Sequence, residues 1–142
     1  MSSSQSLRPQ RRKSRPERPV AALPQALIVD DDPDILRAVG LVLEKNGYEV
    51  HLASTGTEAL SHFEHADVVD LLVTDLVLPH LDGLSLIANI RTERPDLPVI
   101  AMTGADQSDL RLLCAELEGA GSVLAKPFGT KDLLSAVDDA LR

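Results

Sequence analysis

The segment from Val68 to Pro79 has the sequence VVDLLVTDLVLP, and it determines how the rest of the chain is interpreted. Its apolar centre, Leu71 to Val73, is bounded by polar residues, which is typical of a short strand buried on both faces. The strand ends at Asp75, and an ionised carboxylate there is costly unless it meets solvent, a cation or a partner. Because open parallel sheets bind ligands at the carboxyl ends of their strands, Asp75 is the candidate functional residue. An aspartate that only caps a turn is the alternative.

The composition limits the class of protein. A chain of 142 residues is long enough for one domain with a core, and it has no run of about 18 apolar residues that could span a membrane. Cys114 is the only cysteine, which excludes a disulfide framework and favours the reducing cytoplasm. Tyr48, Phe63 and Phe128 are too few aromatic residues for a base-stacking nucleic-acid platform. The core must be built from Leu, Val, Ile and Ala, as in a layered helix–sheet protein.

Charge divides the sequence into two parts. Residues 1–24 carry six basic residues against one acidic residue, Glu17, whereas residues 25–142 carry 8 basic and 21 acidic residues. The first part also contains four prolines, and its composition is too poor in apolar residues to fold alone. We expect a disordered basic tail at 1–24 and a single domain at 25–142. A nucleic-acid arm that binds phosphates is one alternative role for the tail, and an electrostatic contact with an acidic surface, including that of its own domain, is another. A transit peptide is disfavoured, because prolines oppose an amphipathic helix.

Apolar segments alternate with helical spacing from Ala26 onward. Asp32 before Pro33 predicts a helix start, with a capping carboxylate and proline at the first helical position, and Asn46-Gly47 predicts the end of that helix. Strands are expected at about 26–29, 49–53, 71–75, 98–102 and 122–125, and helices at about 33–45, 57–65, 84–92, 110–117 and 133–141. This alternation predicts a doubly wound α/β fold, with a five-stranded parallel sheet between layers of five helices.

Polar side chains follow the ends of four of these strands. The first strand ends at Asp30 and Asp31, the third at Asp75, the fourth at Thr103 and the fifth at Lys126. Taken singly, each has an ordinary alternative as a cap, a turn residue or a solvated lysine, but in a parallel sheet all five meet at one edge. Three carboxylates repel one another and one lysine cannot neutralise them, so a hard divalent ion such as Mg²⁺ is predicted. A partly open metal shell beside a carboxylate nucleophile suits phosphoryl transfer onto Asp75.

From Ala26 to Arg142 the sequence resembles the receiver domain of bacterial two-component response regulators, including the single-domain chemotaxis regulator. The resemblance rests on LIVDDD at 27–32, TDLVLP at 74–79 with Asp82-Gly83, MTG at 102–104 and KPF at 126–128. It implies the flavodoxin-like strand order 2-1-3-4-5, for which this family is itself a standard example. It also implies a function: a cytoplasmic, phosphorylatable signalling module.

The resemblance assigns the metal and the phosphoryl group to particular residues. Asp75 would accept the phosphoryl group from a histidine kinase, a histidine phosphotransfer protein or a small phosphodonor. Asp31, Asp75 and the backbone carbonyl of Val77 would bind Mg²⁺, and Asp30 would help through a bridging water. Val77 and Ala105 stand at the two variable positions that tune hydrolysis of the acyl phosphate in this family, and neither side chain can hydrogen-bond an attacking water.

The resemblance also concerns the fourth and fifth strand ends. Thr103 would hydrogen-bond one phosphoryl oxygen and Lys126 would pair with another, and a cis peptide is expected at Lys126–Pro127. Receivers usually carry Tyr or Phe three residues before the lysine, as a ring that swings inward on activation. Here that position is Val123, so we expect the output signal to use backbone shifts after Thr103 and a different surface.

Three alternatives to a phosphorylatable receiver remain. A degenerate receiver would bind partners without phosphorylation. A phosphohydrolase with an aspartyl nucleophile would need a second acid two residues after Asp75, where Val77 stands. A nucleotide-binding domain would need a Gly-rich turn or a Walker lysine, which the Asp-Asp-Asp-Pro turn lacks. We therefore expect a phosphoacceptor rather than an enzyme, with an unknown protein as output target and no DNA-binding module. His51, His62, His65 and His80 are expected to be ordinary surface histidines.

Overall fold

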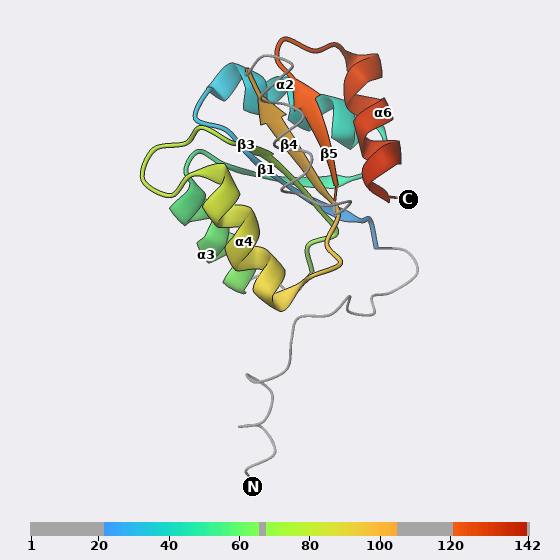
Figure 1. The fold of residues 1–142 in the computed structure, drawn as a ribbon. Helices are drawn as coiled ribbons and strands as arrows, with labels where there is room; N and C mark the ends of the chain where they lie inside the picture. The colour runs from blue at the N-terminus through green and yellow to red at the C-terminus, as the bar shows by residue number, and fades with distance from the viewer. Residues whose placement is uncertain (1–21, 66–67, 105–120, 142) are drawn as a thin grey trace, which may run out of the picture.

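The computed structural model describes residues 22–65, 68–104 and 121–141. Parallel strands form one five-stranded sheet in the order β2-β1-β3-β4-β5, which confirms the strand order (Figure 1). The strands are β1 (Gln25–Val29), β2 (Glu49–Ala53), β3 (Leu71–Asp75), β4 (Val99–Thr103) and β5 (Gly121–Ala125). The helices in these ranges are α2 (Pro33–Lys45), α3 (Gly56–His65), α4 (Gly83–Glu93) and α6 (Thr130–Leu141). The helix predicted at 110–117 and the tail at 1–21 lie outside the described residues.

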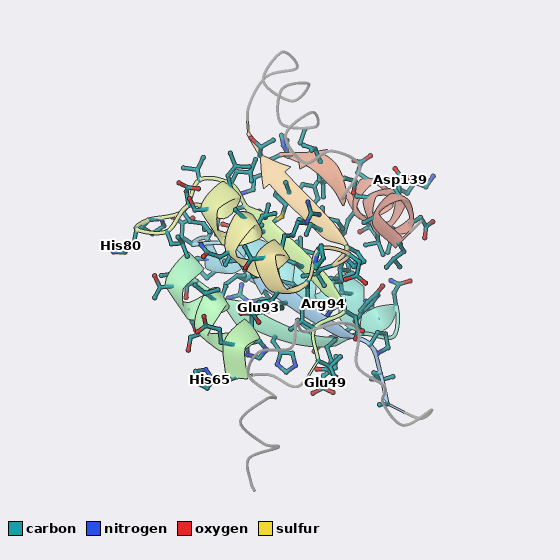
Figure 2. All side chains as sticks on the ribbon, turned by 60° about the horizontal axis from the view of Figure 1, so that its bottom comes forward. Glu49, His65, His80, Glu93, Arg94 and Asp139 are labelled. Carbon is teal, nitrogen blue, oxygen red and sulfur yellow. The ribbon has the colours of Figure 1, made fainter. Side chains whose placement is uncertain are left out.

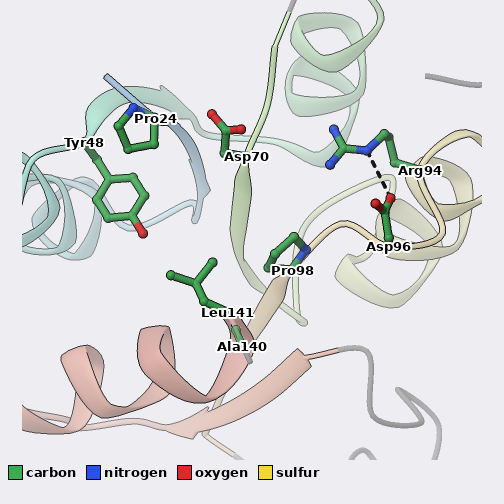
Figure 3. A pocket seen from close by; sticks show the side chains of 8 residues that line it. All are labelled: Pro24, Tyr48, Asp70, Arg94, Asp96, Pro98, Ala140 and Leu141. Carbon is green, nitrogen blue, oxygen red and sulfur yellow. Dashed lines mark hydrogen bonds and ion pairs between the residues drawn. The ribbon is translucent and has the colours of Figure 1, made fainter. Parts of the chain in front are cut away.

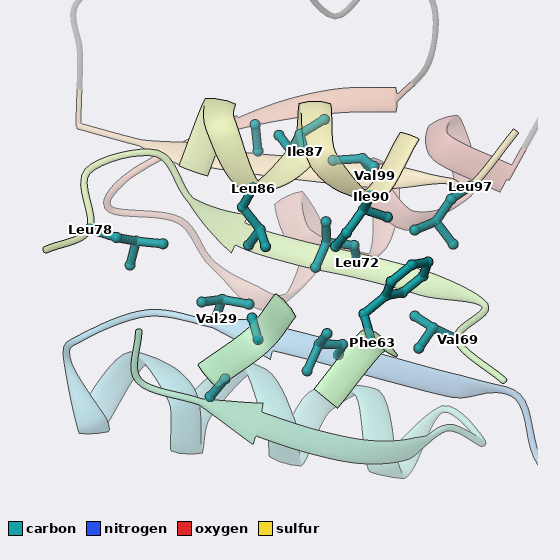
Figure 4. Close-up of a cluster of buried hydrophobic side chains, with 14 of the residues drawn as sticks. Val29, Phe63, Val69, Leu72, Leu78, Leu86, Ile87, Ile90, Leu97 and Val99 are labelled. Carbon is teal, nitrogen blue, oxygen red and sulfur yellow. The ribbon is translucent and has the colours of Figure 1, made fainter. Parts of the chain in front are cut away.

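The sheet lies between two helical layers, with α3 and α4 on one face and α2 and α6 on the other (Figure 1). Successive residues of a strand point to opposite faces, so Leu72 of β3 joins the cluster under α3 and α4 while Leu71 and Val73 join the cluster under α2 and α6. Figure 4 shows the first cluster, in which Phe63 of α3 lies beside Val69 and Leu72. Every residue of β3 is buried, as predicted for the strand that carries Asp75.

The helix starts follow the capping signals in the sequence. The carboxylate of Asp32 accepts a hydrogen bond from the Asp34 amide at 2.9 Å, and Pro33 is the first helical residue of α2. Asp82 caps α4 in the same way, accepting from the Ser85 amide at 2.8 Å. Both helix starts therefore use a capping carboxylate that the local sequence supplies.

Several element boundaries differ from the prediction by one to three residues, and two of these differences concern the fourth and fifth strands. Thr103, expected just after the fourth strand, is the last residue of β4. Gly121, which lies just before the strand predicted at about 122–125, is the first residue of β5, and it pairs with Val99. A Cβ at position 121 would lie 3.2 Å from the Val99 Cα and closer still to its carbonyl group. The glycine thus belongs to the sheet because the backbones of β4 and β5 approach there.

None of the helices within the described ranges is both long and apolar enough to cross a membrane.

Candidate functional site

Three carboxylates meet at the carboxyl edge of the sheet. Strands β1 and β3 are paired so that Val29 lies opposite Thr74, which brings the residues after β1 beside the last residue of β3. One carboxylate oxygen from each of Asp30, Asp31 and Asp75 lies within 4.8 Å of the others. The side chains of Asp30 and Asp75 are buried, whereas Asp31 is exposed. The structure therefore brings together the three acids that the sequence placed at this edge.

Neighbouring amides orient the two buried carboxylates. The Asp32 amide donates to Oδ1 of Asp30 at 2.9 Å, and the Val77 amide donates to Oδ1 of Asp75 at 3.2 Å. Each acid is thus held by the loop that follows its own strand, and the opposite oxygen, Oδ2, is turned toward the fifth strand. Val77 lies in the loop directly after Asp75, and its side chain is 76% exposed.

Lys126 reaches both buried acids from the end of β5. Its Nζ donates to Oδ2 of Asp30 at 2.8 Å and to Oδ2 of Asp75 at 3.1 Å. Burial raises the pKa of Asp30, and the carboxylate of Asp75 adds to that rise, although the hydrogen bond from Lys126 opposes it. Burial lowers the pKa of Lys126, but the hydrogen bonds to Asp30 and Asp75 outweigh it, so the net shift is upward. A protonated lysine between two carboxylates is the stable state of this edge.

The fourth strand adds Thr103 to the same edge. Met102 pairs with Asp75 in the sheet, so Thr103 lies one residue beyond Asp75 along the neighbouring strand. Its side chain is buried, and its carbonyl accepts a hydrogen bond from the Lys126 amide at 2.8 Å. The peptide bond after Lys126 is cis, as the resemblance implied. Ala105, the second of the variable positions, lies outside the described residues.

Val123, the position that lacks the usual aromatic ring, is the middle residue of β5. It pairs with Ala101 of β4, is half-buried and packs against the cluster beneath α3 and α4. A valine at this place is a packing residue of the sheet, and it has no ring that could change rotamer.

The loop after Asp75 depends on two glycines that sequence reasoning did not single out for this role. The Gly83 amide donates to the Leu76 carbonyl at 3.0 Å, and a Cβ on Gly83 would lie 2.6 Å from the Leu76 Cα. A Cβ on Gly56, at the start of α3, would lie 3.0 Å from the Cβ of Leu81. The Asp-Gly pair at 82–83 was the only local signal for this close approach. Because neither glycine has a Cβ, the loop can pack closely against the first residues of α3 and α4.

His80 lies at the exposed tip of the same loop, directed away from the sheet (Figure 2). Its φ is 69°, the left-handed region that residues other than glycine rarely adopt. The short loop between Pro79 and the Asp82 cap makes the chain reverse here.

The prediction of surface histidines holds for His65 and His80, which are exposed, but not for His51 and His62, which are half-buried. His65 is exposed, and its Nδ1 lies 2.8 Å from the Ser61 carbonyl. His62 is half-buried, and its ring centroid lies 4.6 Å from that of His51 on β2. Burial lowers the pKa of His62, and the neighbouring His51 lowers it further. The two residues belong to successive elements, β2 and α3, and the packing of α3 on the sheet makes them a pair.

Lowering the pH from above to below about 6.5 is expected to reduce the free energy of unfolding through His62. Its pKa in the folded protein is depressed, so the unfolded chain takes up the proton first and acid favours unfolding. The stabilisation is complete above the unfolded pKa and is lost as the pH falls toward the folded one. Urea unfolding at several pH values measures the slope. His62→Gln should flatten it and His65→Gln should not; an unchanged slope in His62→Gln would contradict the assignment.

The acid cluster fits a hard divalent cation. Within the described part of the chain it is the only group of three or more His, Cys, Asp or Glu side chains close enough together to hold a metal ion. One ammonium, that of Lys126, faces the three carboxylates, so negative charge is in excess. Mg²⁺ prefers oxygen ligands and usually takes one or two carboxylates together with water and phosphate oxygens. The donor set and its charge match that preference.

Residues 26–138 match the family of response regulator receiver domains. The chain belongs to this family. A receiver domain from Clostridium thermocellum is 35% identical with a TM-score of 0.73, and the match covers 84% of this chain and 94% of that one. The chemotaxis response regulator CheY4 of Vibrio cholerae is 26% identical with a TM-score of 0.75, and the match covers 84% and 99% of the two chains. The fold and the family therefore agree with the resemblance seen in the sequence.

Longer regulatory proteins also match this receiver domain. GlrR of Escherichia coli K12 is 40% identical over 115 residues, which are 81% of this chain and 26% of GlrR. The response regulator MprA of Mycobacterium avium is 37% identical over 116 residues, 82% of this chain and 50% of MprA. The chain thus spans between a quarter and a half of the length of these relatives. Receiver domains are phosphoacceptors rather than classical enzymes, they bind Mg²⁺ at an acidic pocket, and their partners are kinases.

Proposed function

We propose that this receiver domain is phosphorylated on Asp75 in a Mg²⁺-dependent reaction and signals through protein contacts. The observation that carries the proposal is the bridge from Lys126 Nζ to Asp30 and Asp75 inside the three-carboxylate cluster. Lys126 stands 51 residues after Asp75 in the sequence. A degenerate receiver, which is not phosphorylated, would not need to keep this lysine and the buried acid pair that it contacts. The complete set of acids, threonine and lysine therefore favours a phosphoacceptor.

The metal would be held by Asp31, Asp75 and the backbone carbonyl of Val77, with Asp30 assisting through a water. When bound, Mg²⁺ would neutralise charge on the phosphoryl oxygens. Asp30 is completely buried and already tied to Lys126 and to the Asp32 amide, which suits an indirect role. Asp31 is exposed and can approach the metal from the solvent side.

The chain's own groups position the nucleophile. A carboxylate oxygen of Asp75 attacks phosphorus, the bond from phosphorus to the donor nitrogen or oxygen breaks, and the donor atom keeps the electron pair. The Val77 amide orients Asp75 at 3.2 Å. Lys126, held at 3.1 Å from the same carboxylate, would bind one phosphoryl oxygen, and the hydroxyl of Thr103 would bind another. Positioning and charge neutralisation supply most of the rate in such transfers.

The donor in the cell would be a histidine kinase or a histidine phosphotransfer protein, and the output target would be another protein. The phosphohydrolase alternative remains disfavoured because position 77 is a valine with an exposed side chain, which cannot serve as a general acid. Because Val123 has no ring to rotate, the output signal would use backbone shifts after Thr103 and a different surface. Residues 25–142 would act as the receiver domain and residues 1–24 as a separate basic segment, in the cytoplasm.

Incubation of the full chain with Mg²⁺ and a small acyl phosphate tests the proposal. Intact mass spectrometry is expected to show the addition of one phosphoryl group, which is absent when a chelator removes the metal. Reductive cleavage of the acyl phosphate followed by peptide mapping should place it on Asp75. A chain that gains no phosphoryl mass under conditions that label a known receiver would favour the degenerate alternative instead.

A further inference from the structure

A cavity of about 470 Å³ opens at the amino edge of the sheet, opposite to the edge that carries Asp75 (Figure 3). Its position follows from its lining, because Pro24, Asp70 and Pro98 each stand at or next to the start of a strand. Ala140 and Leu141, from the end of α6, extend the apolar wall, together with the ring of Tyr48. The cavity therefore combines prolines, aliphatic groups and one aromatic ring.

Carboxylates give this cavity a negative character. Asp70 and Asp96 both line it. Asp70 is buried and its Oδ2 accepts a hydrogen bond from the Gln25 amide at 2.7 Å, whereas Asp96 is exposed. Burial raises the pKa of Tyr48, and the nearby carboxylates of Asp70 and Asp138 raise it further, which places negative charge around the phenol. The single cation in the lining, Arg94, is already engaged: its Nε donates to Asp96 at 3.3 Å and its Nη1 to the Val69 carbonyl at 2.8 Å.

The basic tail contains a segment with matching chemistry. Residues 15–19 are Arg-Pro-Glu-Arg-Pro, in which the two prolines form a P-x-x-P pattern and each follows an arginine. Such segments favour the polyproline II conformation and bind aromatic-lined grooves. Arginines beside the prolines add charge that acidic residues can attract, and their aliphatic stems can cover apolar surface. A segment too polar to fold alone can become ordered on a groove that already exists.

Covalent attachment places this segment next to the cavity. Pro24 is part of the lining, and Pro19 precedes it by five residues, which span at most about 18 Å when extended. A covalent connection of this length gives an effective concentration in the millimolar range. Even weak complementarity would then keep the segment docked.

We propose that residues 15–19 dock in cis in the cavity between Tyr48, Asp96 and Leu141, with the prolines against the ring and the arginines beside the exposed carboxylates of Asp96 and Asp138. The basic segment then covers the edge of the sheet that is farthest from Asp75. The phosphorylation edge stays accessible to a donor while part of the domain's negative charge is neutralised. This inference does not depend on the proposed function.

Tyr48 provides a specific readout, because the chain has one tyrosine and no tryptophan. Tyrosine fluorescence of the full chain can be quenched with acrylamide, a neutral molecule that reports the accessibility of the ring. The variant Arg15→Ser/Arg18→Ser should release the segment and increase the quenching constant about twofold, since millimolar effective concentrations keep most of the parent docked. High salt should increase the constant of the parent in the same direction, because it screens the charges.

The matched control is Arg8→Ser/Arg11→Ser, which removes the same charge outside residues 15–19 and should quench like the parent. Nuclear Overhauser effects from the Tyr48 ring to proline protons of residues 16 and 19 give a direct second measurement. Equal quenching in the parent and both variants, or an equal increase in both variants, would overturn the proposal. A quenching constant of the parent that falls as the protein concentration rises would also overturn the proposal, because the tail of a second copy would then be covering Tyr48.

Discussion

Replacing Asp75 with asparagine is expected to abolish phosphoryl incorporation completely. The amide has nearly the shape of the carboxylate and can still accept a hydrogen bond from Val77 or Lys126, which contact the carboxylate at 3.2 and 3.1 Å. It lacks the negative charge that makes the oxygen a nucleophile and a metal ligand. The fold should therefore persist while the reaction stops. Intact mass after treatment with Mg²⁺ and a small acyl phosphate measures the result, and circular dichroism confirms folding.

Asp82→Asn is the matched control for this loss. Asp82 is exposed in the same loop, and it caps α4 through the Ser85 amide at 2.8 Å. Asparagine caps helices as well as aspartate does, so this variant removes an equal charge without disturbing the helix. It should gain phosphoryl mass like the parent. Incorporation into Asp75→Asn at the parental level would mean that another residue, such as Asp30 or Asp31, is the acceptor.

Replacing Gly83 with alanine is expected to lower the free energy of unfolding by about 2 to 3 kcal/mol, within the range for overpacking a tight contact. The new Cβ would lie 2.6 Å from the Leu76 Cα and 3.0 Å from the Asp75 carbonyl carbon. Both atoms belong to the backbone, so no side chain can rotate away. The loop must shift, and with it the Val77 amide that orients Asp75. Urea unfolding measures the stability, and the rate of phosphoryl incorporation, which should also fall, measures the effect on the site.

Gly40→Ala, in contrast, is expected to raise the free energy of unfolding. Gly40 is a buried residue inside α2, where a Cβ would meet only the Val50 side chain at 3.5 Å and the Leu52 side chain at 3.6 Å. These are ordinary packing distances, and alanine is favoured over glycine in a helix interior by about 0.5 to 1 kcal/mol. The two variants are measured side by side. If Gly40→Ala is stabilised but Gly83→Ala is as stable as the parent, the loop adjusts easily to the new Cβ and does not constrain Asp75.

Local signals were sufficient to predict most of the fold. The Asp32-Pro33 pair starts α2, and the continuous burial of β1 and β3 follows from apolar runs covered on both faces of a parallel sheet. The convergence of Asp30, Asp75 and Lys126 was also predictable, because parallel strands bring their carboxyl ends to one edge. These inferences succeed because each depends on the order of residues within one element or on the topology of the whole sheet.

Contacts between elements could not be predicted in the same way. The pairing of His51 with His62 depends on how α3 packs against β2, and the amino-edge cavity combines residues from the starts of strands and the end of α6. The approach of Gly83 to Leu76 is a matter of tenths of an ångström in a loop. Sequence spacing carries no information about such distances, because they are set by packing after the elements have formed.

The sequence by itself determined the strand order through its resemblance to receivers, and it determined which acids, hydroxyl and ammonium share one edge. Only the tertiary structure decided that Lys126 bridges Asp30 and Asp75 at hydrogen-bond distance, which the protein needs in order to bury two like charges. It also decided that the opposite edge is hollow and negative. The residue at the end of each strand can be read from the local sequence, whereas cavities and ion pairs form where several elements pack together.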